Sequence, residues 1–217
     1  MPVFLHILLL IFPAAILFGA LLPLHFRLKR RGEAGQSAAV KGLCTAVPIL
    51  FCLNGCLVGG FRGFWWLLAG LALCLAGDIA REKNLLAGMG GYAAAHVLFM
   101  IAFTVYARPK ALAVPVFLVL YAAAVFAFRK RFREMKGRRA LFLLYTALSL
   151  GMLSMALCLP TLPGTLVLAG GAALFVLSDL TAARNLLNGE QATRRSEAFS
   201  LVCYYAGLYL IALSVWF

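Results

Sequence analysis

The chain has 217 residues, of which 64% are hydrophobic and only 12% are charged, and its mean hydropathy is +0.97. Soluble domains carry about 25% charged residues, so this chain has too few to cover the surface of a soluble fold of its length. The composition therefore argues against a water-soluble enzyme, a secreted disulfide scaffold and a disordered chain. We predict an all-α polytopic membrane protein.

Eight segments are apolar and long enough to span a bilayer, which requires about 20 residues of helix. In chain order they are residues 3–24, 38–57, 61–80, 89–107, 111–128, 140–158, 163–183 and 197–217. The first segment follows no positively charged region and is too long for a signal peptide, so we expect it to be a spanning helix. The segments occupy most of the chain, which predicts a single membrane domain over residues 1–217.

The basic residues are distributed unevenly between the predicted loops. Three (Arg62, Arg108 and Lys110) lie in even-numbered loops, and Lys41 lies inside the second segment. The odd-numbered loops hold the other sixteen, which are Arg27, Lys29, Arg30, Arg31, Arg81, Lys83, Arg129, Lys130, Arg131, Arg133, Lys136, Arg138, Arg139, Arg184, Arg194 and Arg195. Cytoplasmic loops carry an excess of Lys and Arg, so we predict that both termini are extracytoplasmic. Since every predicted span has a helix pattern and none has that of a barrel strand, we expect an inner or plasma membrane protein. The net charge of +13 then indicates a basic face toward a lipid bilayer, not a nucleic-acid partner.

Residues 70–88 and 171–189 resemble each other at a constant offset of 101 positions. Both begin Gly-x-Ala-Leu, both reach an aspartate (Asp78 and Asp179), and both end in Asn-Leu-Leu-x-Gly. Four predicted helices separate the copies, so both cross the membrane in the same direction. This favours a parallel 4+4 internal repeat with halves of roughly 1–110 and 111–217. Chance similarity between two helices rich in Leu and Ala is the alternative.

The cysteines all fall inside predicted spans. Cys52 and Cys56 share a helix face, but no histidine or carboxylate accompanies them at the spacing of a metal site. We therefore expect reduced packing residues, and we predict neither a metal nor a cofactor. The six are Cys44, Cys52, Cys56, Cys74, Cys158 and Cys203.

Asp78 and Asp179 are the only aspartates. They lie near the cytoplasmic ends of the third and seventh segments, about 3–6 Å inside the predicted helix ends at 1.5 Å rise per residue. A charged side chain at the bilayer centre costs about 2.5–3.5 kcal/mol on insertion scales, and such residues usually face the bundle interior. A structural aspartate bonded to a neighbouring arginine such as Arg81 is the alternative. Equivalent positions in the repeat favour a shared site.

Other polar side chains are expected at the same depth. Each also has an ordinary interpretation: the lysine can extend to the headgroups, the histidine can be a packing residue, and the tyrosines can belong to an interfacial belt. Their shared depth is what favours one site. They are Lys41, Tyr92, His96, Tyr145, Ser149, Ser200, Tyr204 and Tyr205.

Two carboxylates at a membrane boundary suit acid–base catalysis on a lipid. Like charges disfavour one another, so one carboxyl can hold a proton while the other is ionised. The chain has no Gly-x-Ser-x-Gly elbow, His-Glu-x-x-His motif or P-loop, so a serine hydrolase, that type of zinc hydrolase and an NTPase lack support. His96 has no second histidine placed to complete a metal site with the two aspartates.

The order of these motifs resembles the YhhN family of membrane lysoplasmalogenases over nearly the whole chain. The residues that carry the resemblance are Lys41, Gly77-Asp78, Ala95-His96, Ser178-Asp179 and Tyr204-Tyr205. The resemblance implies hydrolysis of the vinyl ether of lysoplasmalogens, which yields a fatty aldehyde and glycerophosphoethanolamine or glycerophosphocholine. It implies that Asp78 and Asp179 are the catalytic pair and that no metal is needed. The substrate-binding residues would be Lys41, Tyr92, His96, Tyr145, Ser178, Tyr204 and Tyr205.

Two other classes remain open at this point. A transporter or proton-coupled carrier of a lipid or small solute is compatible with a parallel repeat and paired carboxylates, although the outer half of the predicted bundle is poor in polar residues. A lipid-binding or scaffold protein without turnover is the third possibility. For the enzyme we expect a lysophospholipid substrate and the bilayer as partners. The sequence specifies neither the oligomeric state nor the headgroup preference.

Overall fold

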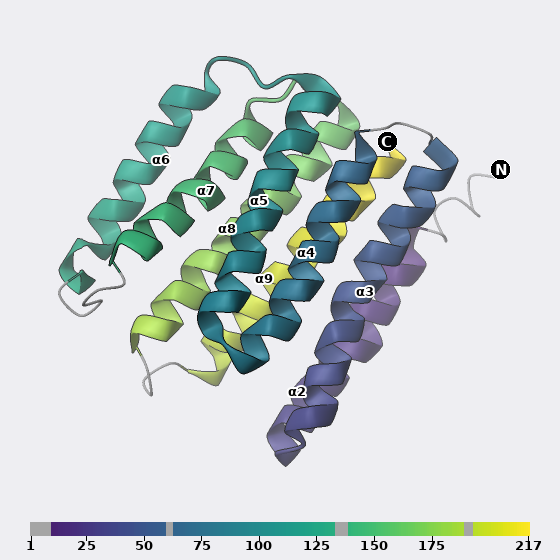
Figure 1. The fold of residues 1–217 in the computed structure, drawn as a ribbon. Helices are drawn as coiled ribbons and strands as arrows, with labels where there is room; N and C mark the ends of the chain where they lie inside the picture. The colour runs from purple at the N-terminus through teal and green to yellow at the C-terminus, as the bar shows by residue number, and fades with distance from the viewer. Residues whose placement is uncertain (1–9, 60–62, 133–138, 189–192) are drawn as a thin grey trace.

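The computed structural model describes residues 10–59, 63–132, 139–188 and 193–217. Eight of its helices are long and apolar enough to cross a membrane (Figure 1), and the described ranges contain no strand. The predicted all-α fold with eight spanning helices is confirmed. Some sequence predictions lie outside the described residues: the start of the first segment (3–9) and Arg62, Arg133, Lys136, Arg138 and Gly189.

The helices follow the predicted segments in number and order. The first spanning helix is Leu10–Arg31, and it includes a π-helical stretch, η1 (Ala15–Leu21), followed by α2 (Leu22–Arg31). The others are α3 (Ala34–Gly59), α4 (Phe64–Lys83), α5 (Leu85–Ala107), α6 (Ala113–Phe128), α7 (Arg139–Leu157), α8 (Pro163–Asn188) and α9 (Arg194–Leu213). Short 3₁₀ turns, η2 (Arg129–Arg131) and η5 (Ser214–Trp216), continue α6 and α9.

The predicted segment ends were wrong on the charged side of the bundle. The first helix continues to Arg31 and α8 to Asn188, so many of the predicted loop charges lie on helices. Lys and Arg are good helix formers, and their long side chains reach toward headgroups. The first helix ends only where Gly32 takes a left-handed backbone, with φ 78°.

The longer helices also change the expected depth of the two aspartates. Asp78 lies five residues before the end of α4, and Asp179 lies nine residues before the end of α8. At 1.5 Å rise per residue these separations are about 8 Å and about 14 Å. Both carboxylates are therefore further from their helix ends than the apolar pattern indicated.

Six helices form a ring, in the order α3, α4, α5, α7, α8 and α9, in which each contacts the next and α9 returns to α3. The two remaining helices lie outside it, α2 against α3 and α6 against α7. Figure 1 shows α4, α5 and α7 in front of α8 and α9. The main helix contacts follow the same order in the two halves of the chain, although α4 also contacts α9. The duplication itself stays a prediction.

Glycines bring the aspartate-bearing helices close to the helices that follow them. A Cβ atom on Gly91 of α5 would lie 2.8 Å from Cα of Gly77 in α4. In the second half, a Cβ atom on Gly171 of α8 would lie 2.9 Å from the carbonyl oxygen of Gly207 in α9. Small residues at such crossings allow helix backbones to approach within a membrane. The Gly77–Gly91 crossing places α5 directly beside Asp78.

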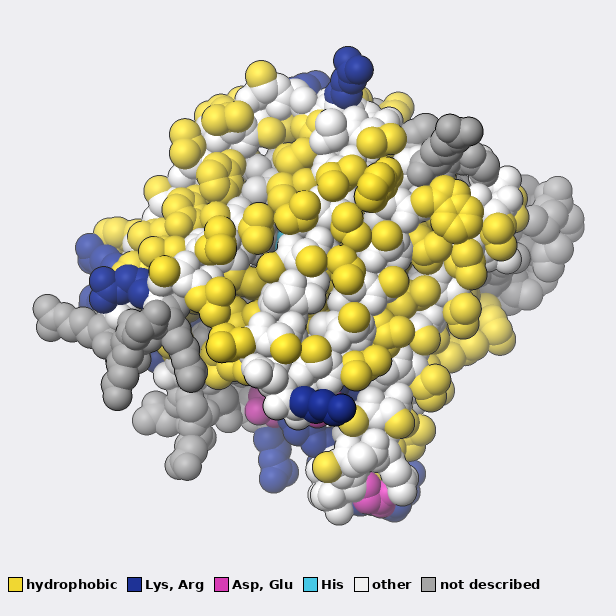
Figure 2. Space-filling view, in the orientation of Figure 1, with side chains coloured by type: hydrophobic (Ala, Val, Ile, Leu, Met, Phe, Trp, Pro, Cys, Tyr) yellow, Lys and Arg dark blue, Asp and Glu magenta, His cyan; other side chains and the backbone are white. Residues whose placement is uncertain are grey.

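The surface is that of a membrane-spanning bundle. Figure 2 shows hydrophobic side chains over most of the visible face, with Lys and Arg side chains gathered near the ends of the helices. Exposed apolar residues such as Leu50, Val58 and Val119 face outward from the bundle. All six cysteines are buried and none forms a disulfide, as predicted. The membrane and the orientation of the termini stay predictions.

Candidate active site at two carboxylates

Asp78 is the centre of the first polar cluster. Its side chain is 3% exposed. Oδ2 accepts hydrogen bonds from the hydroxyls of Thr45 at 2.6 Å and Tyr204 at 2.9 Å, and Oδ1 accepts one from Tyr92 at 2.9 Å. The three donors come from α3, α9 and α5, so the carboxylate joins four helices of the ring.

Lys41 adds a cation to this cluster. Its Nζ lies 3.4 Å from Oδ1 of Asp78 and 3.1 Å from Oε1 of Glu82, and its side chain is 11% exposed. Lys41 precedes Thr45 by one helical turn, which places both on the face of α3 that meets Asp78. The lysine is thus held between two carboxylates of α4 and is largely buried.

Asp179 is the centre of the second cluster. Oδ1 accepts a hydrogen bond from the Tyr145 hydroxyl at 2.9 Å, and Oδ2 accepts one from Ser149 at 2.8 Å. Both donors lie on α7, one turn apart. The side chain of Asp179 is 13% exposed, so it is more accessible than Asp78. Tyr145 is therefore a hydrogen-bond partner of the carboxylate.

His96 of α5 lies against Asp179 and is fully buried. Its Nε2 is 3.2 Å from Oδ2 of Asp179, but the two are not aligned for a hydrogen bond. Nδ1 has no hydrogen-bond partner among the residues that the structure describes. The ring packs edge-on against Tyr145 and is tilted on Phe175, with centroids 5.6 Å and 5.0 Å away. The imidazole is thus held in place mainly by aromatic contacts.

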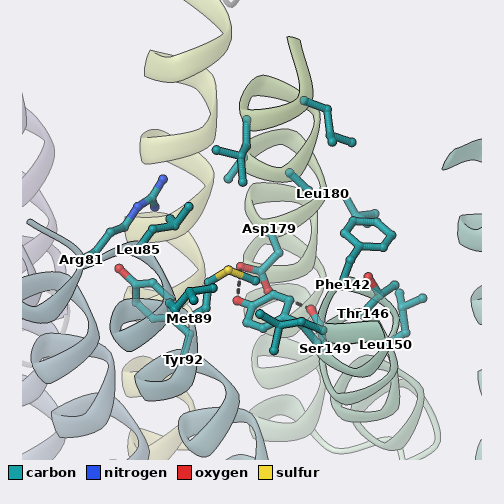
Figure 3. Close-up of a pocket in the computed structure, with 17 residues that line it drawn as sticks. Arg81, Leu85, Met89, Tyr92, Phe142, Thr146, Ser149, Leu150, Asp179 and Leu180 are labelled. Atoms are coloured by element: carbon teal, nitrogen blue, oxygen red, sulfur yellow. Dashed lines mark hydrogen bonds between the residues drawn. The ribbon is translucent and has the colours of Figure 1, made fainter. Parts of the chain in front are cut away.

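Two cavities meet at these clusters. A small one of about 40 Å³ is lined by both aspartates. A larger pocket of about 680 Å³ lies between α5, α7 and α8, and its lining is mostly apolar. Figure 3 shows Asp179 facing this pocket opposite Met89 and Tyr92. Both cavities are lined by Arg81, Tyr92, Asp179 and Ala182. One water molecule requires about 10–15 Å³ of cavity volume, so the small cavity has room for water.

Two predicted binding residues, Ser178 and Tyr205, make neither a described hydrogen bond nor a described ion pair with the two aspartates. Ser178 lines the small cavity, but its hydroxyl pairs with that of Ser200 at 3.2 Å. Tyr205 donates to the backbone carbonyl of Lys41 at 3.2 Å. These contacts hold α9 against α8 and α3. The other five predicted binding residues (Lys41, Tyr92, His96, Tyr145 and Tyr204) lie within one of the two clusters.

Thr45 and Glu82 are cluster members that the sequence analysis missed. Each lies four residues from a residue that was chosen, Thr45 from Lys41 and Glu82 from Asp78. Residues four apart share a helix face, so this spacing was an available signal. The alternative pairing of Asp78 with Arg81 does not occur, because the described partners of Asp78 are Lys41 and three hydroxyls.

The chemistry of the site is that of two carboxyl groups in unlike surroundings. Within the described ranges, no three His, Cys, Asp or Glu side chains are grouped closely enough to hold a metal ion. Asp78 receives three hydroxyl hydrogen bonds and an ammonium group, which together compensate a negative charge. Asp179 faces an apolar pocket. One accessible and one fully enclosed carboxyl on a shared cavity can serve as a proton donor and a proton acceptor.

Comparison with known proteins gives one match. No curated protein and no solved structure matches this chain. The sequence model of the YhhN family matches residues 36–215, which include α4, α5, α7 and α8 complete and both aspartates. The match covers most of the chain, and it agrees with the resemblance seen in the motifs. The chain belongs to the YhhN family.

Proposed function

We propose that the protein is a lysoplasmalogenase-like ether hydrolase of the membrane. Its substrates would be 1-alkenyl-glycerophosphoethanolamine or 1-alkenyl-glycerophosphocholine, and its products a fatty aldehyde and the glycerophospho alcohol. The observation that carries the proposal is the pair Asp78 and Asp179 on one small cavity, with Asp179 also lining an apolar pocket. Membership of the YhhN family supports it.

The pocket suits an alkenyl chain. Its volume of about 680 Å³ is within the range of roughly 300–1,000 Å³ that is typical of small-molecule sites. The lining includes Leu85 and Met89 of α5, Leu150 of α7 and Leu187 of α8. We propose that the chain lies among these side chains, so that the vinyl ether reaches Asp179. The charged helix ends beside the pocket would face the cytoplasmic leaflet.

Asp179 is the proposed general acid. Vinyl ethers hydrolyse by protonation of the carbon β to oxygen, which leaves an oxocarbenium ion. Asp179 would donate this proton, because it is the carboxyl that lines the chain-binding pocket. The resulting Asp179 carboxylate and Asp78 would both stabilise the cation, as the carboxylates of a glycosidase do.

Asp78 is the proposed general base. A water molecule in the small cavity would add to the oxocarbenium carbon and transfer a proton to Asp78, giving a hemiacetal. In the collapse of the hemiacetal, Asp78 returns this proton to the leaving glycerol oxygen, and Asp179 takes the proton of the new hydroxyl. One water is consumed, the C–O bond breaks, and both carboxyl groups return to their starting states.

The test is turnover by the purified protein in detergent micelles. Aldehyde and glycerophospho products are measured by mass spectrometry, with the reaction run in deuterated water and in oxygen-18 water. We expect one deuterium on the carbon next to the aldehyde carbonyl and no oxygen-18 in the glycerophospho product. Cleavage on the glycerol side of the ether would instead place oxygen-18 in the glycerophospho product.

The matched variants are Asp78→Asn and Asp179→Asn. Each should lower kcat by about 10²–10⁴-fold, the usual contribution of a general acid or base. Glu197→Gln is the control, since Glu197 is an exposed carboxylate that is paired with Lys29 at 2.8 Å and lines neither cavity. Wild-type turnover in either Asn variant contradicts the mechanism. If no alkenyl lysolipid is cleaved, the hydrolase proposal is wrong, and the carrier and scaffold interpretations take its place.

A further inference from the structure

Arg81 occupies a position that the proposed reaction does not use. It lies on α4 three residues after Asp78, and it lines both the small cavity and the apolar pocket. Figure 3 shows it with Leu85 at one edge of the pocket, with Asp179 on the opposite wall. Leu85 begins α5, so this edge is the one nearest the charged helix ends. A molecule that extends from Asp179 to this edge of the pocket can contact Arg81.

The charge of Arg81 is not compensated within the described part of the chain. No hydrogen bond or ion pair engages its guanidinium there, and the side chain is exposed. Lys41 differs, since it lies within 3.4 Å of Asp78 and 3.1 Å of Glu82. A cation already paired with two carboxylates has little attraction left for an anionic ligand. Arg81 is therefore the better anion-binding group of the two.

The spacing also fits a glycerophospholipid. Six bonds separate the vinyl-ether carbon from phosphorus in the proposed substrate. Arg81 stands about 4.5 Å further along α4 than Asp78, at 1.5 Å per residue, and its side chain extends beyond that. The ether can thus lie beside the carboxylates while the phosphate reaches the guanidinium. Arginine is suited to this contact because its planar fork donates two parallel hydrogen bonds to a phosphate.

We propose that Arg81 binds the phosphodiester of the substrate lysolipid and so selects phosphate-bearing alkenyl lipids. This inference rests on the proposed function for the identity of the substrate. In this assignment Arg81 binds the phosphate, and Lys41 pairs with Asp78. The chemistry recognised is a phosphate oxygen pair, which a lipid headgroup and free phosphate share.

The first experiment compares two substrates, alkenyl-glycerophosphoethanolamine and alkenylglycerol, which lacks the phosphate. The measured quantity is the ratio of kcat/KM for the first over the second. Loss of a hydrogen-bonded charge contact predicts that Arg81→Gln lowers this ratio about 10- to 100-fold, mainly through KM of the phospholipid. Arg81→Lys should give an intermediate ratio. Lys83→Gln is the control, because Lys83 is an exposed cation two residues away that lines neither cavity.

The second experiment measures binding without turnover. The probe is 1-acyl-lysophosphatidylethanolamine, which has no vinyl ether, and its competitors are inorganic phosphate and glycerophosphoethanolamine. We expect Arg81→Gln to weaken probe binding about 10- to 100-fold, and we expect neither chain-free competitor to displace the probe at equal concentration. Equal displacement by inorganic phosphate would overturn the lipid assignment, since it would indicate a general anion site.

The outcomes separate this inference from the proposed function. An unchanged substrate ratio in a folded Arg81→Gln protein, with an unfolding temperature like that of the wild type, overturns the inference while hydrolysis stands. An equal loss in Lys83→Gln also overturns it, because the effect would then be one of general surface charge. Arg81-dependent probe binding without any aldehyde release would refute the hydrolase and leave the phosphate site supported.

Discussion

The two aspartates have equivalent places in the sequence pattern and unlike surroundings in the structure. Asp78 is enclosed by three hydroxyl donors from three helices and by Lys41. Asp179 receives two hydroxyls from α7 alone, lies beside His96 and lines the large pocket. A buried carboxylate whose charge is balanced by a cation and hydrogen-bond donors is costly to disturb. A carboxyl group at the edge of a pocket is available to a ligand. Similar motifs can therefore supply different halves of one reaction.

The largest expected difference is in stability. Asp78→Ala would leave Lys41 buried with only the half-exposed Glu82, together with three hydroxyls that lose their acceptor. Breaking a buried ion pair from one side costs about 3–5 kcal/mol. Asp179→Ala, which strands two hydroxyls and no lysine, should cost less, about 1–3 kcal/mol. Reversible unfolding of the two variants in detergent measures both, and equal losses would remove the distinction between the sites.

Single hydroxyl deletions sharpen the same comparison. Tyr145 is the only described hydrogen-bond donor to Oδ1 of Asp179, whereas Oδ1 of Asp78 keeps Lys41 when Tyr92 is changed. Tyr145→Phe should therefore cost about 1–3 kcal/mol, the range for leaving a buried polar atom without its hydrogen-bond partner, and Tyr92→Phe should cost less. The measurements are the unfolding midpoint and kcat. A larger effect from Tyr92→Phe would contradict the predicted order.

The glycine crossing tests whether the Asp78 cluster depends on helix spacing. Gly91→Ala would place a Cβ 2.8 Å from Cα of Gly77, beside Asp78, whereas Gly90→Ala meets nothing within 4 Å. Overpacking of this kind typically costs about 1–3 kcal/mol. Gly90→Ala should be neutral or stabilising by up to about 1 kcal/mol, because Ala is the better helix former. Thermal unfolding and turnover of this adjacent pair decide the matter, and equal behaviour would disprove the close approach of α4 and α5.

The smallest effect is expected at Glu82. Its side chain is 50% exposed, and its pair with Lys41 is backed by the Asp78 contact. Exposed ion pairs contribute about 0–1 kcal/mol, so Glu82→Gln should change the unfolding free energy by no more than this. Glu197→Gln, which removes the exposed partner of Lys29, is the matched control, and we expect an equally small change in its unfolding free energy. A loss as large as that of Asp78→Ala would show that Lys41 is held by Glu82 and not by Asp78.

Most of the candidate site was foreseeable from residue type and depth. Lys41, Asp78, His96 and Asp179 are polar groups in apolar segments, and such residues are costly enough in a bilayer to mark an interior site. Thr45 was missed because a threonine hydroxyl in a helix usually bonds its own backbone and gives no such signal. Glu82 was missed because it lies among the charges that end α4.

The amino-acid sequence by itself determined the class of this protein through its composition, and the number of spanning helices and the two carboxylates to examine through the order of its residues. These follow from the cost of placing polar groups in lipid, which acts on each segment separately. The tertiary structure decided where the helices end, which donors surround each aspartate, and that Arg81 and not Lys41 is the cation open to a ligand. Such choices depend on helix rotation and crossing, and segments that are apolar on every side carry no mark of which face turns inward. Close contacts such as Gly77 with Gly91 set that rotation, and they join residues that only the folded bundle brings together.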